Sequence, residues 1–170
     1  MRNFIACLSA GVLLASAGAA GAATATTTFT ISETLVKNCT VGATNIVFAN
    51  YTPGSGVSPA ANSTVSVSCT KSTAFTVALN KGTTAGGTIA QRLMTDGAAG
   101  DTLQYNLYTT NAFSTVWGDG TGTSVTQPGT GTGMATPVVF TAFGQLPDNA
   151  TNRGAPPNTY TDTITVTVTY

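Results

Sequence analysis

Histidine is absent from this sequence, and charge of either sign is scarce. Six basic and six acidic residues make up 7% of the chain, against roughly a quarter in an ordinary globular domain. Histidine is the side chain that most often acts as a general acid or base near neutral pH, so its absence weighs against acid–base catalysis. With no basic stripe to neutralise phosphates, we expect no nucleic-acid partner. The polar surface must instead consist of Thr, Ser, Asn and Gly, which favour strands and turns.

Catalytic and metal-binding groups are equally sparse. The aspartates are scattered, mostly where turns are predicted: Asp96, Asp101, Asp119, Asp148 and Asp162. Gly118-Asp119-Gly120 predicts a turn, because one carboxylate is too little for a calcium cage. We therefore predict no enzyme, no metal and no cofactor, although two carboxylates that meet in space would still allow a glycosidase.

The N-terminus has the pattern of a secretory signal peptide. Arg2 supplies positive charge, an apolar run continues from Phe4 to Ala20, and Ala20-Gly21-Ala22 has the small residues of a cleavage site. The pattern predicts export, with residues 1–22 removed by cleavage before Ala23. The alternative is a membrane-spanning helix, for which this run is short. No other stretch is long enough to span a bilayer, so we expect no membrane insertion after cleavage.

Two cysteines remain once the signal segment is removed, Cys39 and Cys69. Two cysteines in an exported chain favour one structural disulfide. The bridge would close a loop of about 30 residues and stabilise the fold by roughly 3–4 kcal/mol in the chain-entropy model. A metal site and a redox pair are disfavoured, because the chain has no histidine and the spacing is not Cys-x-x-Cys.

Apolar residues alternate with period two in several short segments, and no long helical pattern appears. The segments predicted as strands are residues 65–69, 75–79, 92–94, 103–107, 137–143 and 160–170, and residues 27–35 alternate as well. Residues 70–73 are predicted to be a tight connection, and residues 121–133 and 148–158 to be loops. Short strands separated by turns favour an all-β sandwich, with a closed barrel as the alternative.

Three aromatic residues suggest an alternative function. Tyr105, Tyr108 and Trp117 would form a sugar-binding platform if their rings shared one exposed surface. Alternating strands more often place such rings in the core. A surface- or carbohydrate-binding adhesin subunit therefore stays an alternative.

Both ends of the mature chain favour strand formation. The apolar face of the C-terminal end comprises Ile164, Val166, Val168 and Tyr170. This end contains neither Lys nor an internal Pro, so its edge invites pairing with another chain. Residues 23–36 precede the first cysteine and are equally strand-prone. A chain with one open edge and one free strand can polymerise head to tail, as in chaperone–pilin strand complementation.

Several short segments follow one another along the mature chain: Phe29-Thr-Ile31, Asn38-Cys39-Thr40-Val41, Val47-Phe48 with Tyr51-Thr52-Pro53, Val65-Ser-Val67-Ser-Cys69, Leu103-Gln-Tyr105-Asn-Leu107-Tyr108, Ala142-Phe143-Gly144-Gln145-Leu146-Pro147 and residues 160–170. In this order, behind a signal peptide, they resemble the spore coat protein U domain, the domain of archaic (Csu-type) chaperone–usher pilus subunits.

The resemblance implies an incomplete immunoglobulin-like β-sandwich that is completed by donor-strand exchange. Its parts would be a signal peptide (1–22), a donor-strand segment (23–36) and the sandwich domain (37–170). The donor side chains would be Phe29, Ile31 and Leu35. The acceptor groove would be flanked by the C-terminal strand, through Ile164, Val166, Val168 and Tyr170, and the disulfide would be Cys39–Cys69. Glu33 departs from the pattern, since a small or apolar residue is preferred there, and leaves the register open by a residue or two.

The implied function is a structural subunit of a surface pilus or fimbria that supports adhesion or biofilm formation. Its partners would be a periplasmic chaperone, an outer-membrane usher and identical or related subunits in a fibre. The protein would pass through the periplasm to the extracellular pilus. A secreted spore-coat-like structural protein, not assembled by an usher, is a further alternative.

Overall fold

The computed structural model describes residues 21–97 and 100–170. The chain divides into two units, one ending at Thr34 and one running from Leu35 to Tyr170. Residues 21–38 contain no helix or strand, so the strand predicted for residues 27–35 is absent from the free chain. A strand needs a neighbour to complete its hydrogen bonds, and residues 27–35 form no backbone–backbone hydrogen bond to another described residue. The predicted signal peptide lies almost entirely outside the described residues.

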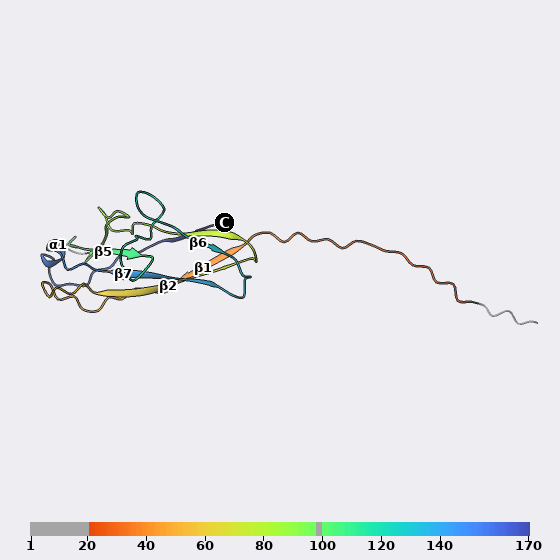
Figure 1. The fold of residues 1–170 in the computed structure, drawn as a ribbon, viewed down its shortest axis with the longest axis horizontal. Helices are drawn as coiled ribbons and strands as arrows, with labels where there is room; N and C mark the ends of the chain where they lie inside the picture. The colour runs from red at the N-terminus through yellow and green to blue at the C-terminus, as the bar shows by residue number, and fades with distance from the viewer. Residues whose placement is uncertain (1–20, 98–99) are drawn as a thin grey trace, which may run out of the picture. The chain divides into compact units, whose positions relative to one another are not determined.

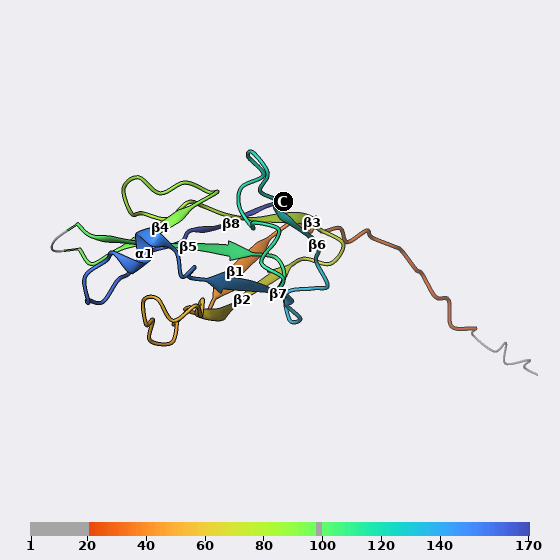
Figure 2. The same cartoon turned by 60° about the vertical axis from the view of Figure 1, so that its left-hand side comes forward.

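The second unit consists of two antiparallel sheets (Figures 1 and 2). The five-stranded sheet has the order β1 (Cys39–Ala43), β2 (Ala60–Cys69), β7 (Val138–Gln145), β5 (Thr102–Tyr108) and β4 (Arg92–Thr95). The three-stranded sheet has the order β6 (Gln127–Thr130), β3 (Ala74–Leu79) and β8 (Val166–Thr169). A single-turn helix, α1 (Ala150–Arg153), follows β7.

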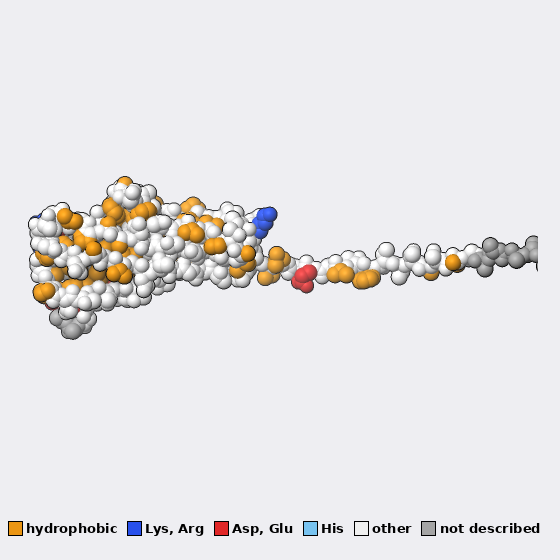
Figure 3. Space-filling view, turned by 90° about the horizontal axis from the view of Figure 1, so that it is seen from below, with side chains coloured by type: hydrophobic (Ala, Val, Ile, Leu, Met, Phe, Trp, Pro, Cys, Tyr) orange, Lys and Arg blue, Asp and Glu red, His pale blue; other side chains and the backbone are white. Residues whose placement is uncertain are grey.

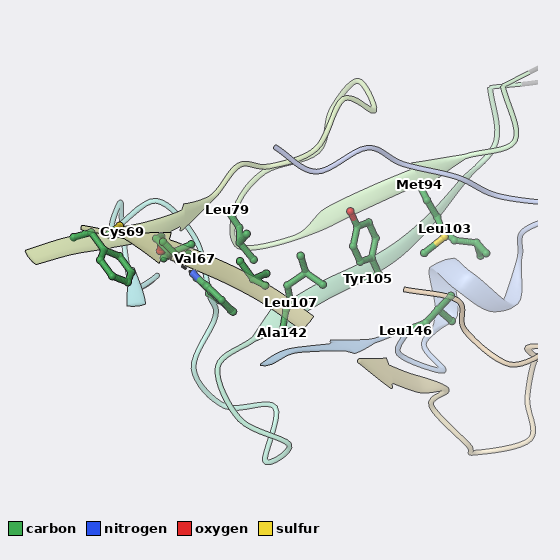
Figure 4. Close-up of a cluster of buried hydrophobic side chains, with 13 residues drawn as sticks. Val67, Cys69, Leu79, Met94, Leu103, Tyr105, Leu107, Ala142 and Leu146 are labelled. Carbon is green, nitrogen blue, oxygen red and sulfur yellow. Dashed lines mark hydrogen bonds between the residues drawn. The ribbon is translucent and has the colours of Figure 1, made fainter. Parts of the chain in front are cut away.

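The two sheets enclose one core, as predicted for an immunoglobulin-like sandwich. Alternate residues of β2 and β3 point inward because strand side chains alternate between faces. The buried set is Val65, Val67, Cys69, Phe75, Val77, Leu79, Met94, Leu103, Tyr105, Leu107, Trp117, Ala142 and Leu146. Figure 4 shows these side chains converging from both layers.

The sandwich is joined at one side and open at the other. At the joined side, Thr95 and Thr161 exchange backbone hydrogen bonds of 2.9 and 2.8 Å. At the other side, β1 and β8 lie near each other but share no ladder among the described residues. The closed-barrel alternative is therefore wrong.

Trp117 and Tyr105 belong to this core. Trp117 is 0% exposed and Tyr105 is 6% exposed. The indole N–H of Trp117 donates to the Val77 carbonyl at 3.0 Å. These two rings cannot form an exposed platform, so the sugar-binding surface suggested for Tyr105, Tyr108 and Trp117 is wrong.

Two predicted loops contain regular structure. Residues 127–130 form β6, where Pro128 is tolerated because an edge strand can lack an N–H donor. Gly129 leaves room for the Phe75 ring, which an added Cβ would meet. Residues 150–153 form α1, which Asn149 caps by accepting from the Asn152 N–H at 2.9 Å. The connection over residues 70–73 joins the two sheets rather than two neighbours within one sheet.

A disulfide joins Cys39 to Cys69, as the cysteine count predicts. The two residues face each other directly in the register of β1 and β2. β1 has no other ladder partner among the described strands. The bridge therefore secures an edge strand to the sheet.

Candidate functional site

β8 is hydrogen-bonded on one side only. It pairs with β3, and the Asn80 N–H donates to the Thr165 carbonyl immediately before it at 3.1 Å. Successive residues of an antiparallel strand direct their backbone groups to opposite sides. Thr165 faces β3, so the backbone groups of Val166 and Val168 face an open edge.

A second unpaired segment, residues 45–50, follows β1. Across the described chain, its backbone groups make no hydrogen bond. Ile46 and Phe48 pack against the core, while Val47 between them is 82% exposed. This alternation is typical of an extended segment, so residues 45–50 form a wall with free backbone groups.

A groove of about 950 Å³ separates this wall from residues 160–166. Its floor is apolar and comprises Val65, Leu79, Met94, Leu103, Leu107, Ala142 and Leu146. Figure 4 shows several of these side chains, among them Leu79, Leu107 and Ala142, lying together between the strands. On the side that Figure 3 shows, hydrophobic side chains are interspersed with uncharged polar ones, and few charged groups appear.

Exposure on the inner face of β1 also indicates a missing strand. Val41 lies directly opposite Val67 in the ladder, so both side chains are on the same face. Val67 is 0% exposed, whereas Val41 is 43% exposed. The inner face of β1 lacks the cover that a strand between β1 and β8 would supply.

The predicted acceptor residues divide into two pairs. Ile164 and Val166 line the groove. Val168 packs against the core without lining the groove, and Tyr170, beyond the end of β8, is 52% exposed. The structure therefore brings only the first pair to the groove.

The predicted donor residues are exposed in the free chain. The exposed fractions are 83% for Phe29, 83% for Ile31 and 87% for Leu35. None of them belongs to a strand. Exposed apolar side chains at alternating positions are available to a partner.

The Spore Coat Protein U domain model matches residues 25–167. The chain belongs to this family. Comparison with curated proteins gives no match. Among solved structures, the chain is similar to a chain in the pre-assembly complex of the chaperone CsuC and the tip adhesion subunit CsuE, from the archaic chaperone–usher Csu pili of Acinetobacter baumannii. The TM-score is 0.56 at 22% identity, and the match covers 81% of this chain and 40% of that chain.

Asp162 anchors the C-terminal wall of this spore coat protein U domain. One carboxylate oxygen accepts from the backbone N–H groups of Thr83 and Thr84 at 2.9 and 3.0 Å, and the other accepts from the Tyr105 hydroxyl at 2.6 Å. Burial opposes ionisation, but the hydrogen bonds from Tyr105, Thr83 and Thr84 hold the pKa of Asp162 below its ordinary value. Gly82 packs so closely that a Cβ would collide with this carboxylate.

Asp148 anchors the end of the other wall. It accepts from the Tyr51 hydroxyl at 2.6 Å and from the backbone N–H groups of Gly54 and Gly56 at 3.1 and 2.7 Å. Arg153 forms a salt bridge with it at 2.9 Å. Arg153 and Tyr51 lower the pKa of Asp148, while burial and Asp148 raise the pKa of Tyr51 to about 12. Asp148 thereby connects the loop after residues 45–50 to α1.

These two carboxylates predict acid-sensitive stability. Their pKa values are depressed in the folded protein, so the unfolded chain binds more protons as the pH falls. Their stabilisation should be complete above about pH 5 and should be lost as the pH falls below about 4. Denaturant midpoints measured from pH 3 to pH 7 test this. The Asp148→Asn/Asp162→Asn variant should be less stable at pH 7, and its denaturant midpoint should depend less on pH.

A matched control is Glu33→Gln, which alters an exposed carboxylate of the N-terminal segment. It should leave the stability at pH 7 unchanged. An unchanged slope in the double asparagine variant would contradict the assignment to Asp148 and Asp162.

Only part of this site carries a sequence signal. Asp162 has the same parity as Ile164 and Val166, and a carboxylate on an inward face needs partners. Tyr51 and Asp148 are 97 residues apart, so no local pattern connects them. Within residues 21–97 and 100–170, no group of three potential metal ligands gathers. No helix in these ranges is long and apolar enough to cross a membrane.

Proposed function

We propose that this chain is a structural subunit of a surface pilus, assembled by a chaperone–usher pathway through donor-strand complementation. The groove carries this proposal, because two unpaired backbone edges flank an apolar floor in a domain of the Spore Coat Protein U family. The fold likeness to a chain from a chaperone–subunit complex of Csu pili supports it.

The strand that fills the groove would be the N-terminal segment of the next copy. Phe29 and Ile31 share one face of that segment, with Thr28 and Thr30 on the other. Burying each large apolar side chain contributes roughly 1.5–3 kcal/mol, and a new backbone ladder adds to this. Release would then be very slow, which provides the kinetic stability that a fibre needs.

The direction of the incoming strand decides whether subunits joined in this way form a closed assembly or a continuing filament. We expect the incoming strand to run antiparallel to β8, the more stable arrangement. The C-terminal end of the incoming strand then lies beside Tyr160, in the segment that leads into β8. The acceptor's own chain enters β1 at the opposite end of the domain, where the Asn38 carbonyl accepts from the Thr70 N–H at 2.9 Å. In Figures 1 and 2 the C-terminus and α1 lie toward opposite ends of the domain. A head-to-tail contact of this kind extends into a filament.

The partners are a periplasmic chaperone, an outer-membrane usher and identical or related subunits. An open strand edge invites indiscriminate pairing, so a chaperone would have to cover the groove during passage through the periplasm. The assembled fibre would lie outside the cell and support adhesion or biofilm formation. We assign no catalytic role.

Deletion of residues 23–35 from the exported protein tests the proposal. The truncated subunit should remain a chaperone-bound monomer and should not extend a fibre, as assayed by electron microscopy and by size on a denaturing gel without heating. Fibres of normal length from the truncated subunit would overturn strand donation by this segment.

A matched pair of double substitutions distinguishes the contribution of the buried apolar side chains to assembly from that of backbone pairing. Phe29→Ala/Ile31→Ala removes the apolar face, and Thr28→Ala/Thr30→Ala changes the opposite face of the same segment. The first variant should assemble poorly or yield fibres that heat dissociates easily. The second should assemble almost normally.

A further inference from the structure

Glu33 limits how the N-terminal segment can dock. It shares a face with Phe29, Ile31 and Leu35, and it is the only charged residue in residues 21–36. Any register that inserts all three apolar side chains also inserts Glu33 between Ile31 and Leu35. A carboxylate on an apolar floor without a partner is strongly disfavoured. Glu33 therefore excludes docking of all three apolar side chains together.

Of the positions opposite Tyr160, Asp162 and Ile164, only one is acceptable for Glu33. Within residues 160–166, the inward-facing residues of the groove are Tyr160, Asp162, Ile164 and Val166. Opposite Ile164, Glu33 would lie over the apolar floor. Opposite Asp162, the only charged residue in the described lining, it would face a like charge. Opposite Tyr160, it would lie beside the loop of residues 155–159 that lines the end of the groove.

Arg153 is the cation nearest in sequence to the residues that line that end, although it does not itself line the groove. Its neighbours Asn152 and Ala155 line the groove. The side chain of Arg153 is 49% exposed, and Nε and Nη2 hold Asp148. Nη1 has no hydrogen bond to any part of the chain that the structure describes. A second carboxylate can therefore bind this guanidinium without displacing Asp148.

We propose that the incoming strand docks with Glu33 opposite Tyr160, beside Arg153. This inference rests on the proposed function and specifies its register. It places Ile31 opposite Asp162 and Phe29 opposite Ile164. Leu35 then lies opposite Asn158, on the loop that lines the end of the groove, so the apolar floor receives two large donor side chains rather than the three predicted from the sequence.

Side-chain size agrees with this register. Continuing the antiparallel pairing places Thr27 opposite Val166 and Ala25 opposite Val168. Val168 no longer lines the groove, so the smallest donor residue falls where the groove has ended. Ile31 covers a carboxylate that already accepts hydrogen bonds from Tyr105, Thr83 and Thr84.

Cysteine pairs on the outer face measure the register without altering the plugs. Thr165 is exposed, and its backbone faces β3. It is therefore a non-hydrogen-bonded position toward the donor, where opposed Cα atoms lie about 4.5 Å apart, within disulfide range. The proposed register places Thr28 opposite Thr165. The two alternative registers place Thr30 or Ser32 there.

The experiment compares three full-length double variants in assembled fibres: Thr28→Cys/Thr165→Cys, Thr30→Cys/Thr165→Cys and Ser32→Cys/Thr165→Cys. On a non-reducing denaturing gel, the first should form a reducible multimer ladder at about tenfold higher yield than the others, as expected for disulfide geometry that tolerates little displacement. A stronger ladder from either other pair would overturn the register and leave strand donation intact. Fibres without any ladder would overturn strand docking along β8, and with it the proposed function.

Glu33→Gln tests whether charge sets the register. In this background, the yield of disulfide-linked multimers from the Thr30→Cys/Thr165→Cys pair should rise several-fold. That pair reports the register with residue 33 opposite Asp162, where the like-charge repulsion is now gone. Arg153→Gln should shift the yields in the same direction. Lys37→Gln, in the linking residues before β1, is the matched control and should change nothing. Unchanged yields with Glu33→Gln and Arg153→Gln would overturn the role of charge.

Discussion

Replacing Arg92 with methionine should lower the free energy of unfolding by about 3–5 kcal/mol. Arg92 is 0% exposed. Its Nε donates to the Asn80 carbonyl at 2.9 Å, and its Nη1 donates to Asn106 Oδ1 at 2.6 Å. Its Nη2 donates to the carbonyls of Leu79 and Trp117 at 3.3 and 2.9 Å. The guanidinium therefore connects the end of β3, β5 and the Trp117 turn.

The cost arises from the acceptors that the substitution leaves behind. Methionine fills much of the volume, but it donates no hydrogen bond to the four oxygens. A buried acceptor without a donor loses its hydration with no compensation. Burial lowers the pKa of Arg92, while Tyr105 and Asp162 oppose that shift. Its charge is thus stabilised by carbonyl dipoles and by Asp162 at longer range.

Equilibrium unfolding in guanidinium chloride measures this loss in the purified mature subunit. Arg92→Lys should fall between wild type and methionine, because one ammonium group cannot reach four acceptors in a fork geometry. Lys71→Met removes an exposed cation and serves as the control, with little expected change. A loss below about 1 kcal/mol for Arg92→Met would contradict the role assigned to the four hydrogen bonds of the Arg92 guanidinium.

Removing the disulfide should cost roughly 3–4 kcal/mol, the chain-entropy value for a loop of this length. Cys39 and Cys69 are 30 positions apart. The bridge joins β1 to β2, and β1 leads directly into the wall formed by residues 45–50. Its loss should therefore loosen the groove as well as destabilise the domain.

Cys39→Ala/Cys69→Ala is the suitable variant, because Cys69 is 0% exposed and serine would bury a hydroxyl. Thermal unfolding should show a lower midpoint than wild type, and a reductant should lower the wild-type midpoint toward that of the variant. The variant itself should not respond to reductant. A wild-type midpoint unaffected by complete reduction would show that the bridge is dispensable.

Local patterns predicted the strands that build the core. In β2 and β3, Val65, Val67, Phe75 and Val77 alternate with small polar residues, and period-two alternation with one buried face specifies both strand and orientation. The same rule failed for β6, because Pro128 and Gly129 leave that strand without alternating apolar residues. That strand depends on an edge position and on space for the Phe75 ring.

Long-range contacts account for the rest. The C-terminal alternation begins at Tyr160, yet β8 begins only at Val166. Before that point the chain bends away from β3 toward β4, where Thr161 meets Thr95. The hydrogen bonds of Arg92, the Tyr51–Asp148 contact and the groove floor all join segments that are distant in sequence. A local periodicity carries no information about such long-range contacts.

The sequence by itself determined that this chain is an all-β domain with a disulfide, an inward face on each core strand and two strand-prone ends, because alternation and cysteine number are local properties. Only the tertiary structure decided that β8 and residues 45–50 lack a partner on facing sides of one apolar groove. Whether a backbone edge is paired depends on which strands become neighbours in space. The C-terminal end thus forms a groove wall that is hydrogen-bonded on one side only, and the N-terminal end is the proposed donor segment, in which Glu33 limits the register.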